Sequence, residues 1–171
     1  MFRKFARIII SSIIFLGSIF LFIGGFIFFG ILAVLISGLV LLAHFRNENI
    51  MVAFYYLRKN NMPAAEKALS RVKYPEALIK SQEAYYYYLC GLVQSQLRSV
   101  SKAEKFFKKA LSTGLRMTND QAVAKLNLAG IYLSQRNKKV ATHFLQEAKK
   151  LDKHKLLSDQ IKEIEQMMKR I

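Results

Sequence analysis

The side chains that most often carry out catalysis are few in this chain and lie far apart in its sequence. The three histidines show no spacing typical of metal ligands: His44, His143 and His154. The one cysteine, Cys90, cannot form an internal disulfide, and we expect a buried core thiol rather than a nucleophile. Carboxylates mostly lie close to a lysine along the sequence, as Glu104 does to Lys108, which is typical of solvated pairs on a helix surface.

The sequence also contains no phosphate-binding loop, no metal-binding spacing and no nucleophile elbow. We therefore predict that the protein is not an enzyme and has no catalytic or metal-binding residues. It should need no cofactor and no small-molecule substrate. What remains is binding, through either an apolar surface or a charged one.

The chain is strongly basic, with 27 lysine and arginine residues, 11 acidic residues and a net charge of +16. Residues 8–43 contain no charged side chain, and all acidic residues follow them. A basic surface attracts anionic partners such as lipid headgroups, the RNA of a ribosome or acidic proteins. The alternative is that the lysines only keep the domain soluble. The lysines in question are Lys102, Lys105, Lys108, Lys109, Lys138, Lys139, Lys149 and Lys150.

The uncharged stretch, residues 8–43, is too long for one membrane-spanning helix. A single helix of this length would measure roughly 54 Å, against a hydrocarbon core of roughly 30 Å. Gly24 and Gly25 supply a turn near its middle, so we predict a two-helix transmembrane hairpin in residues 1–45. Its spans would cover about 8–23 and 26–43. Both are short, so a thinned bilayer or a shallow, re-entrant hairpin is the alternative.

Basic residues flank the uncharged stretch on both sides, at Arg3, Lys4 and Arg7 before it and at Arg46 after it. Because positive flanks favour the cytoplasmic side, we expect both termini in the cytoplasm. An integral protein of a prokaryotic inner membrane fits this pattern best. The basic start also resembles a signal peptide, but a second apolar stretch follows at once without a clear cleavage site.

One short pattern returns with a period of 38 residues: at 65–69, 103–107 and 141–145. A fixed period of this size predicts an array of helical repeats, each burying its apolar face against its neighbour. We place the repeats at about 46–80, 82–117 and 119–153. The expected helix pairs are 48–59 with 63–73, 82–97 with 101–113, and 119–134 with 138–151. An amphipathic helix in 154–171 would cap the array.

The repeats place small residues at Ala53, Gly91 and Ala129 and again at Ala65, Ala103 and Ala141, with bulky residues at Leu69, Phe107 and Leu145. In this register residues 46–153 resemble the tetratricopeptide repeat family, in which small residues let paired helices approach and bulky ones fill the gap to the next pair. The period of 38 departs from that family's usual length of about 34 residues. The resemblance implies an all-α chain: a membrane hairpin, a three-unit α-solenoid and a capping helix.

The resemblance also implies a concave groove, which that family lines with the first helix of each pair. At the matching positions this chain has mostly apolar and aromatic residues, so the groove should take an apolar or amphipathic segment of a partner protein. The alternative is that the C-terminal helix or a neighbouring protomer already fills it. The expected groove residues are Ile50, Phe54, Leu57, Tyr85, Tyr88, Leu92, Val123, Leu126 and Leu133.

Together these patterns predict a membrane-anchored adaptor or scaffold that mediates protein–protein interactions at the cytoplasmic face of a membrane. The rival prediction is a basic electrostatic tether that binds a ribosome, RNA or anionic lipid through its lysines. A subunit with no ligand beyond its own complex is a third possibility.

Overall fold

The structure, a computed structural model, describes residues 2–45 and 47–170, with side chains described for 8–40 and 47–170. Every described element is helical and none is a strand, so the predicted all-α class is confirmed for this part of the chain. The chain divides into two compact units, Met1–Asn47 and Glu48–Ile171.

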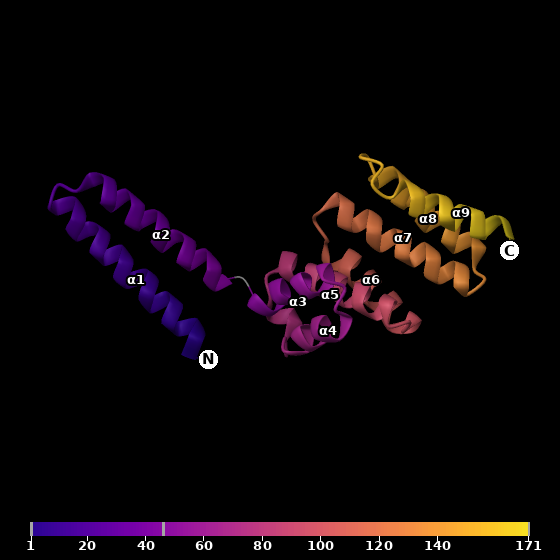
Figure 1. Cartoon of the computed structure of the whole chain (residues 1–171), viewed down its shortest axis with the longest axis horizontal. Coiled ribbons are helices and arrows are strands. Elements are labelled where there is room, and N and C mark those ends of the chain that lie inside the picture. Colours follow the sequence, from indigo (N-terminus) through magenta and orange to yellow (C-terminus); the bar gives the residue numbers. More distant parts are fainter. Residues whose placement is uncertain (1, 46, 171) are drawn as a thin grey trace. The chain divides into compact units, whose positions relative to one another are not determined.

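The first unit is a pair of packed helices, α1 (Phe2–Ile23) and α2 (Ile27–Phe45), joined by a tight turn (Figure 1). Gly25 lies in the left-handed region with φ of 78°, where glycine has no steric penalty. The Phe26 amide donates to the Leu21 carbonyl at 3.0 Å, and the Gly25 amide donates to the Phe22 carbonyl at 3.2 Å. These two bonds satisfy carbonyls at the end of α1 that would otherwise lack a partner.

Small and hydroxylated residues form the contact between α1 and α2. Ser11 and Ser37 are buried there, and each hydroxyl donates to the other's carbonyl oxygen, at 3.1 and 3.0 Å. Gly30 lies against the Phe22 ring, where an added Cβ would come within 2.9 Å of the ring. The helices can therefore approach closely at this seam.

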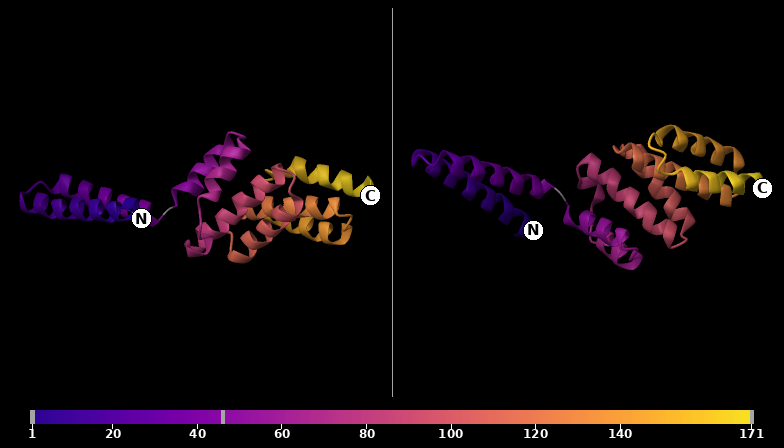
Figure 2. Two further views of the ribbon diagram at one scale, coloured as in Figure 1. Left: turned by 90° about the horizontal axis from the view of Figure 1, so that it is seen from below. Right: turned by 45° about the horizontal axis from the view of Figure 1, so that its top comes forward.

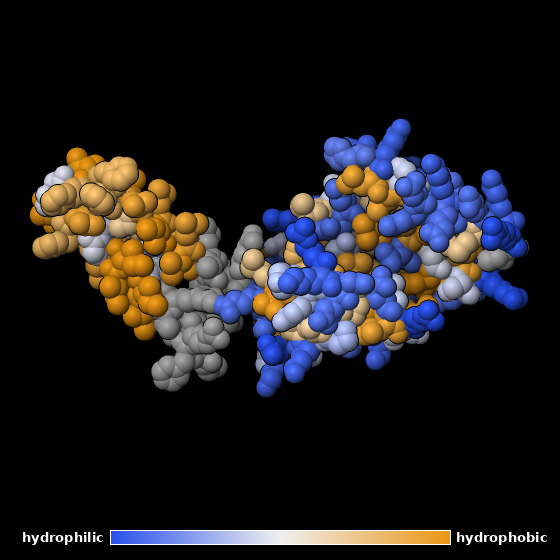
Figure 3. Space-filling model, viewed as in Figure 1, coloured by the Kyte–Doolittle hydropathy of each residue, from blue (hydrophilic) through white to orange (hydrophobic). Residues whose placement is uncertain are grey.

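The outer surface of the hairpin is apolar, as Figure 3 shows for one face. Phe20, for example, is 78% exposed. Among the described residues, however, no helix combines the length and apolarity needed to cross a membrane. By that measure the predicted spans at about 8–23 and 26–43 are not supported.

The second unit contains three consecutive helix pairs and a final helix (Figures 1 and 2). Each pair contacts the next, and the final helix packs on the last pair. A short 3₁₀ turn, η1 (Pro75–Ala77), joins the first two pairs. The pairs are α3 (Glu48–Arg58) with α4 (Met62–Ser70), α5 (Lys80–Gln96) with α6 (Val100–Thr113), and α7 (Thr118–Ser134) with α8 (Lys138–Leu151); the final helix is α9 (Ser158–Arg170).

Polar side chains and glycine mark several of the helix ends. The Asn61 side chain accepts from the Ala64 amide at 3.2 Å at the start of α4, and Asn137 accepts from Val140 at 3.3 Å at the start of α8. Gly114 ends α6 with φ of 101°. α7 begins at Thr118, one residue before the predicted start, and the residue before it, Met117, forms no side-chain capping hydrogen bond, so Asp120 lies inside the first turn of the helix.

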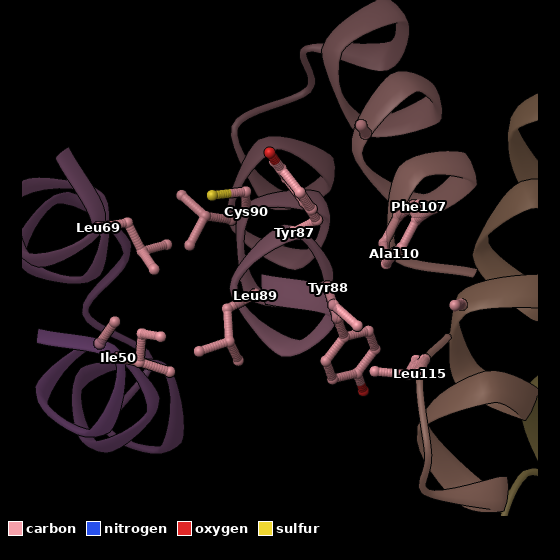
Figure 4. Close-up of a cluster of buried hydrophobic side chains, with 14 of the residues drawn as sticks. Ile50, Leu69, Tyr87, Tyr88, Leu89, Cys90, Phe107, Ala110 and Leu115 are labelled. Carbon is pink, nitrogen blue, oxygen red and sulfur yellow. The ribbon is translucent and has the colours of Figure 1, made fainter. Parts of the chain in front are cut away.

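The small positions of the repeat pattern are buried where paired helices meet. Ala53, Ala65, Ala129 and Ala141 have no exposed surface. In the middle pair the contact leaves no room for a side chain, because a Cβ added to Gly91 would lie only 2.7 Å from ring atoms of Phe107. Figure 4 shows the core around this pair, with Ile50 and Leu69 facing α5 on one side and the Phe107 ring on the other.

The Gly91 contact predicts opposite outcomes for two glycine substitutions. Gly91→Ala should lower the unfolding free energy of the second compact unit, the repeat unit (Glu48–Ile171), by about 1–3 kcal/mol, because the buried Phe107 ring must move to admit the methyl group. Gly130→Ala is the matched control on α7, where the nearest atom to an added Cβ is Ile164 Cδ1 at 3.8 Å. It should be neutral or stabilise by up to about 1 kcal/mol through helix propensity. Thermal unfolding followed by circular dichroism measures both, and equal effects would refute the tight contact.

Candidate functional site

A row of four aromatic rings runs from the surface of α3 into the core of the middle helix pair. The centroids of Phe54 and Tyr85 are 6.2 Å apart, and those of Tyr85 and Tyr88 are 5.8 Å apart. Tyr88 in turn lies 6.5 Å from the fully buried Phe107. The exposed end of the row, Phe54, is 41% exposed, whereas Tyr88 is 6% exposed. The outer rings are therefore held in place by a core residue.

These rings border a pocket of about 360 Å³ between α3, α5 and α7. Five of the nine residues predicted to line a groove lie around this one pocket: Phe54, Leu57, Tyr85, Tyr88 and Leu92. The volume is that of a site for one or two side chains. The other lining residues are Arg58, Asn60, Met62, Leu89, Ser95, Gln96, Asp120 and Asn127.

Burial shapes the chemistry of the pocket. It raises the pKa of Tyr85 to about 12, with a smaller contribution from the nearby Asp120 charge, and it raises the pKa of Tyr88 for the same two reasons. Burial also raises the pKa of Asp120, which is half-buried. Both phenols therefore stay neutral at physiological pH.

The other four predicted groove residues lie elsewhere. Ile50 is in the core between α3 and α5, and Val123 is half-buried. Leu126 is 3% exposed and Leu133 is equally buried, because both pack in the cluster that contains residues of α9. The C-terminal helix thus covers the predicted groove residues of the third repeat. The sequence leaves open whether this helix or a neighbouring protomer fills the groove, and for these residues the helix does so. The covering residues are Leu157, Ile161, Ile164 and Met168.

All eight lysines of the predicted basic surface are exposed, and Figure 3 shows hydrophilic residues over much of this unit. Three of them have intramolecular contacts. Lys108 pairs with Glu104 at 2.7 Å, Lys109 lies 4.4 Å from the centroid of the Tyr87 ring, and Lys149 pairs with Glu165. The other five form no ion pair with any described residue: Lys102, Lys105, Lys138, Lys139 and Lys150.

Glu104 connects the middle and last helix pairs, a role that its sequence spacing to Lys108 does not reveal. Its carboxylate accepts from Tyr132 Oη at 2.8 Å and from Gln135 Nε2 at 3.1 Å, both beyond the end of its own helix. The hydrogen bond from Lys108, followed by those from Tyr132 and Gln135, lowers the pKa of Glu104 from 4.5 to about 2. The folded state therefore favours the ionised carboxylate.

The lowered pKa of Glu104 gives a testable pH dependence. Its stabilising contribution should be complete above pH 4.5, the usual value, and should be lost as the pH falls through about 2. Glu104→Gln should destabilise by about 1–2 kcal/mol at pH 7 and should flatten stability between these pH values. Urea unfolding across this range measures both effects. The control is Glu163→Gln, which changes an exposed glutamate on α9. If Glu104→Gln had the same stability and pH dependence as this control, the stabilising role assigned to the Glu104 carboxylate would be contradicted.

Of the residues considered for catalysis, the structure describes the side chains of Cys90, His143 and His154, whereas that of His44 lies outside the described residues. Cys90 is buried, as expected, and burial raises the pKa of its thiol to about 12, which disfavours the thiolate. The His143 side chain is largely exposed and lies 3.6 Å from Glu147. Within the part of the chain that the structure describes, no three metal-binding side chains gather at one point.

Comparisons with known protein families, curated proteins and solved structures gave no match to this chain.

Proposed function

We propose that this protein is a membrane-embedded, non-enzymatic adaptor. Its N-terminal hairpin would lie in a prokaryotic inner membrane with both ends on the cytoplasmic side. Its helix pairs, which resemble tetratricopeptide repeats in their register of small and bulky residues, would hold an apolar or amphipathic segment of a partner protein. The observation that carries the proposal is the aromatic pocket between α3, α5 and α7.

The pocket suits protein docking because it combines rigid aromatic surface with a few polar groups at its margin. Phe54 and Tyr85 supply partly exposed rings that lose little conformational entropy on binding. Ser95 and Asn127 offer polar atoms at the margin, and they hydrogen-bond to each other at 3.3 Å.

The distribution of polar groups in the hairpin supports the membrane part of the proposal. Ser11, Ser18 and Ser37 are buried and their hydroxyls donate to backbone carbonyls, whereas Ser12 and large apolar side chains such as Leu16 and Leu35 are exposed. A helix pair in water has the reverse arrangement. In lipid, small residues at the contact and satisfied hydroxyls are the usual means of helix association. A hairpin that enters and leaves on one side need not cross the bilayer.

The membrane proposal predicts the effect of charge on the outer face of the hairpin. The double variant Leu16→Asp/Leu35→Asp should move the protein out of the membrane fraction after alkaline carbonate extraction, because each aspartate costs about 2.5–3.5 kcal/mol at the centre of an inserted helix. The control is Leu97→Asp/Leu156→Asp, which makes the same chemical change at two exposed leucines of the repeat unit. If the control variant were extracted as readily as the Leu16→Asp/Leu35→Asp variant, insertion of the hairpin would be refuted.

The docking proposal predicts that the exposed end of the aromatic row is needed to retain a partner. Full-length Phe54→Ala/Tyr85→Ala, purified in mild detergent, should lose a discrete co-purifying protein, with affinity reduced about 30-fold or more. Tyr88 and Leu126 are unsuitable for this test because both are buried, so their truncation would disturb the fold.

The matched control for this test is Tyr74→Ala, which removes an aromatic residue that is 71% exposed and lies outside the pocket. It should retain the partner. A partner that stays with the double variant, at unchanged thermal stability, would show that the pocket is not the docking site.

Five lysines of the predicted basic surface, which have neither an ion pair nor a ring contact with any described residue, support a second candidate, the electrostatic tether: Lys102, Lys105, Lys138, Lys139 and Lys150. Charge-driven binding to anionic lipid or to a ribosome would weaken steeply with added salt, whereas binding in an apolar pocket would depend on it weakly. Recovery of ribosomal proteins with both the wild type and the pocket variant, lost on washing with salt, would favour the tether over the adaptor.

A further inference from the structure

The pocket contains a carboxylate whose charge no described residue balances. Asp120 enters from the first turn of α7 and forms neither a hydrogen bond nor an ion pair with any residue that the structure describes. Its polar neighbour Asn127 is satisfied, because its amide donates to the Val123 carbonyl at 2.8 Å and its oxygen lies 3.3 Å from Ser95 Oγ. Asp120 is therefore a charged group of the pocket that has no partner among the described residues.

Arg58 does not fill this role although it also lines the pocket. Its side chain is exposed, and its guanidinium lies over the Phe54 ring at 5.9 Å from the centroid rather than on the carboxylate. A half-buried carboxylate is stabilised when a cation approaches it, and the burial that raises the pKa of Asp120 shows that water solvates it incompletely. The pocket as it stands is complementary to a positive charge.

The rings beside Asp120 fit the same kind of ligand. Tyr85 and Tyr88 lie 5.8 Å apart and line the same pocket as Asp120, whose charge contributes to the raised pKa of both phenols. Aromatic faces attract cations, and they also bury the methylene stem of a long basic side chain. An acidic side chain would instead meet the like charge of Asp120.

We propose that the pocket binds a lysine or arginine side chain of the partner's apolar segment, with the cationic end at Asp120 and the stem on Tyr85 and Tyr88. This inference rests on the proposed adaptor function and names the chemistry that the pocket selects. The rest of the chain is strongly basic, so a highly basic partner would be repelled. The preferred segment is therefore apolar and carries one basic residue at the centre of its contact.

A random-peptide display library selected on the full-length protein in nanodiscs tests the proposal without knowledge of the partner. Selection on the wild type should enrich peptides with lysine or arginine at one position within an apolar segment. Selection on Asp120→Asn should lose that basic position. The matched control is Asp159→Asn, which makes the same change in the first turn of α9, outside the pocket, and should select the wild-type pattern.

One selected peptide then measures the strength of the contact. Replacing its basic residue with glutamine should weaken binding to the wild type about tenfold and should have little effect on Asp120→Asn, so the two changes are coupled. Equal thermal unfolding of wild type and Asp120→Asn separates this result from a loss of structure.

The outcomes distinguish this inference from the adaptor proposal. Apolar peptides without a basic position, whose binding still requires Phe54 and Tyr85, would overturn the inference and leave the adaptor function standing. Enrichment of acidic residues, or a basic position that Asp120→Asn retains, would also overturn it. A library that yields no pocket-dependent peptide would overturn both.

Discussion

The close approach of α5 and α6 at Gly91 is the contact on which the candidate site depends. Because Gly91 has no Cβ, the Phe107 ring lies flush against α5 with no exposed surface. That ring supports Tyr88, which supports Tyr85, and the row ends at Phe54 on α3. The geometry of the pocket is thus set by core packing, and the outer rings are ordered before any ligand arrives, which lowers the entropic cost of binding.

Stacked helix pairs leave an apolar face at the end of an array, and α9 covers that face here. Its residues Ile161, Ile164 and Met168 share one buried cluster with Leu126 and Leu133 of the last pair. Asp152 fixes the segment that leads into α9. Its two carboxylate oxygens accept hydrogen bonds from the Leu156 and Leu157 amides at 2.9 Å. The candidate pocket lies between α3, α5 and α7.

Local patterns in the sequence predict much of this fold and part of the site. The repeat register identifies the buried small positions, and a spacing of three residues places Tyr85 and Tyr88 on one helix face. Features that depend on helices far apart in sequence could not be predicted. Asp120 lies within α7 and borders the pocket because the preceding loop ends before Thr118. Tyr132 reaches Glu104 because of the angle between α6 and α7. The burial of Leu126 could not be predicted without knowing where α9 packs.

The two units of the chain bury opposite kinds of surface, and the proposed function gives this contrast a purpose. The hairpin contact is made of small and hydroxylated residues, whose close packing and hydrogen bonds are the means of helix association in lipid, and lipid would solvate the exposed leucines and phenylalanines on its outer face. A pocket sized for a side chain or two gives modest affinity by itself. Anchoring raises the effective concentration of a partner in the same membrane, so a weak, selective contact at Asp120 would suffice to hold it.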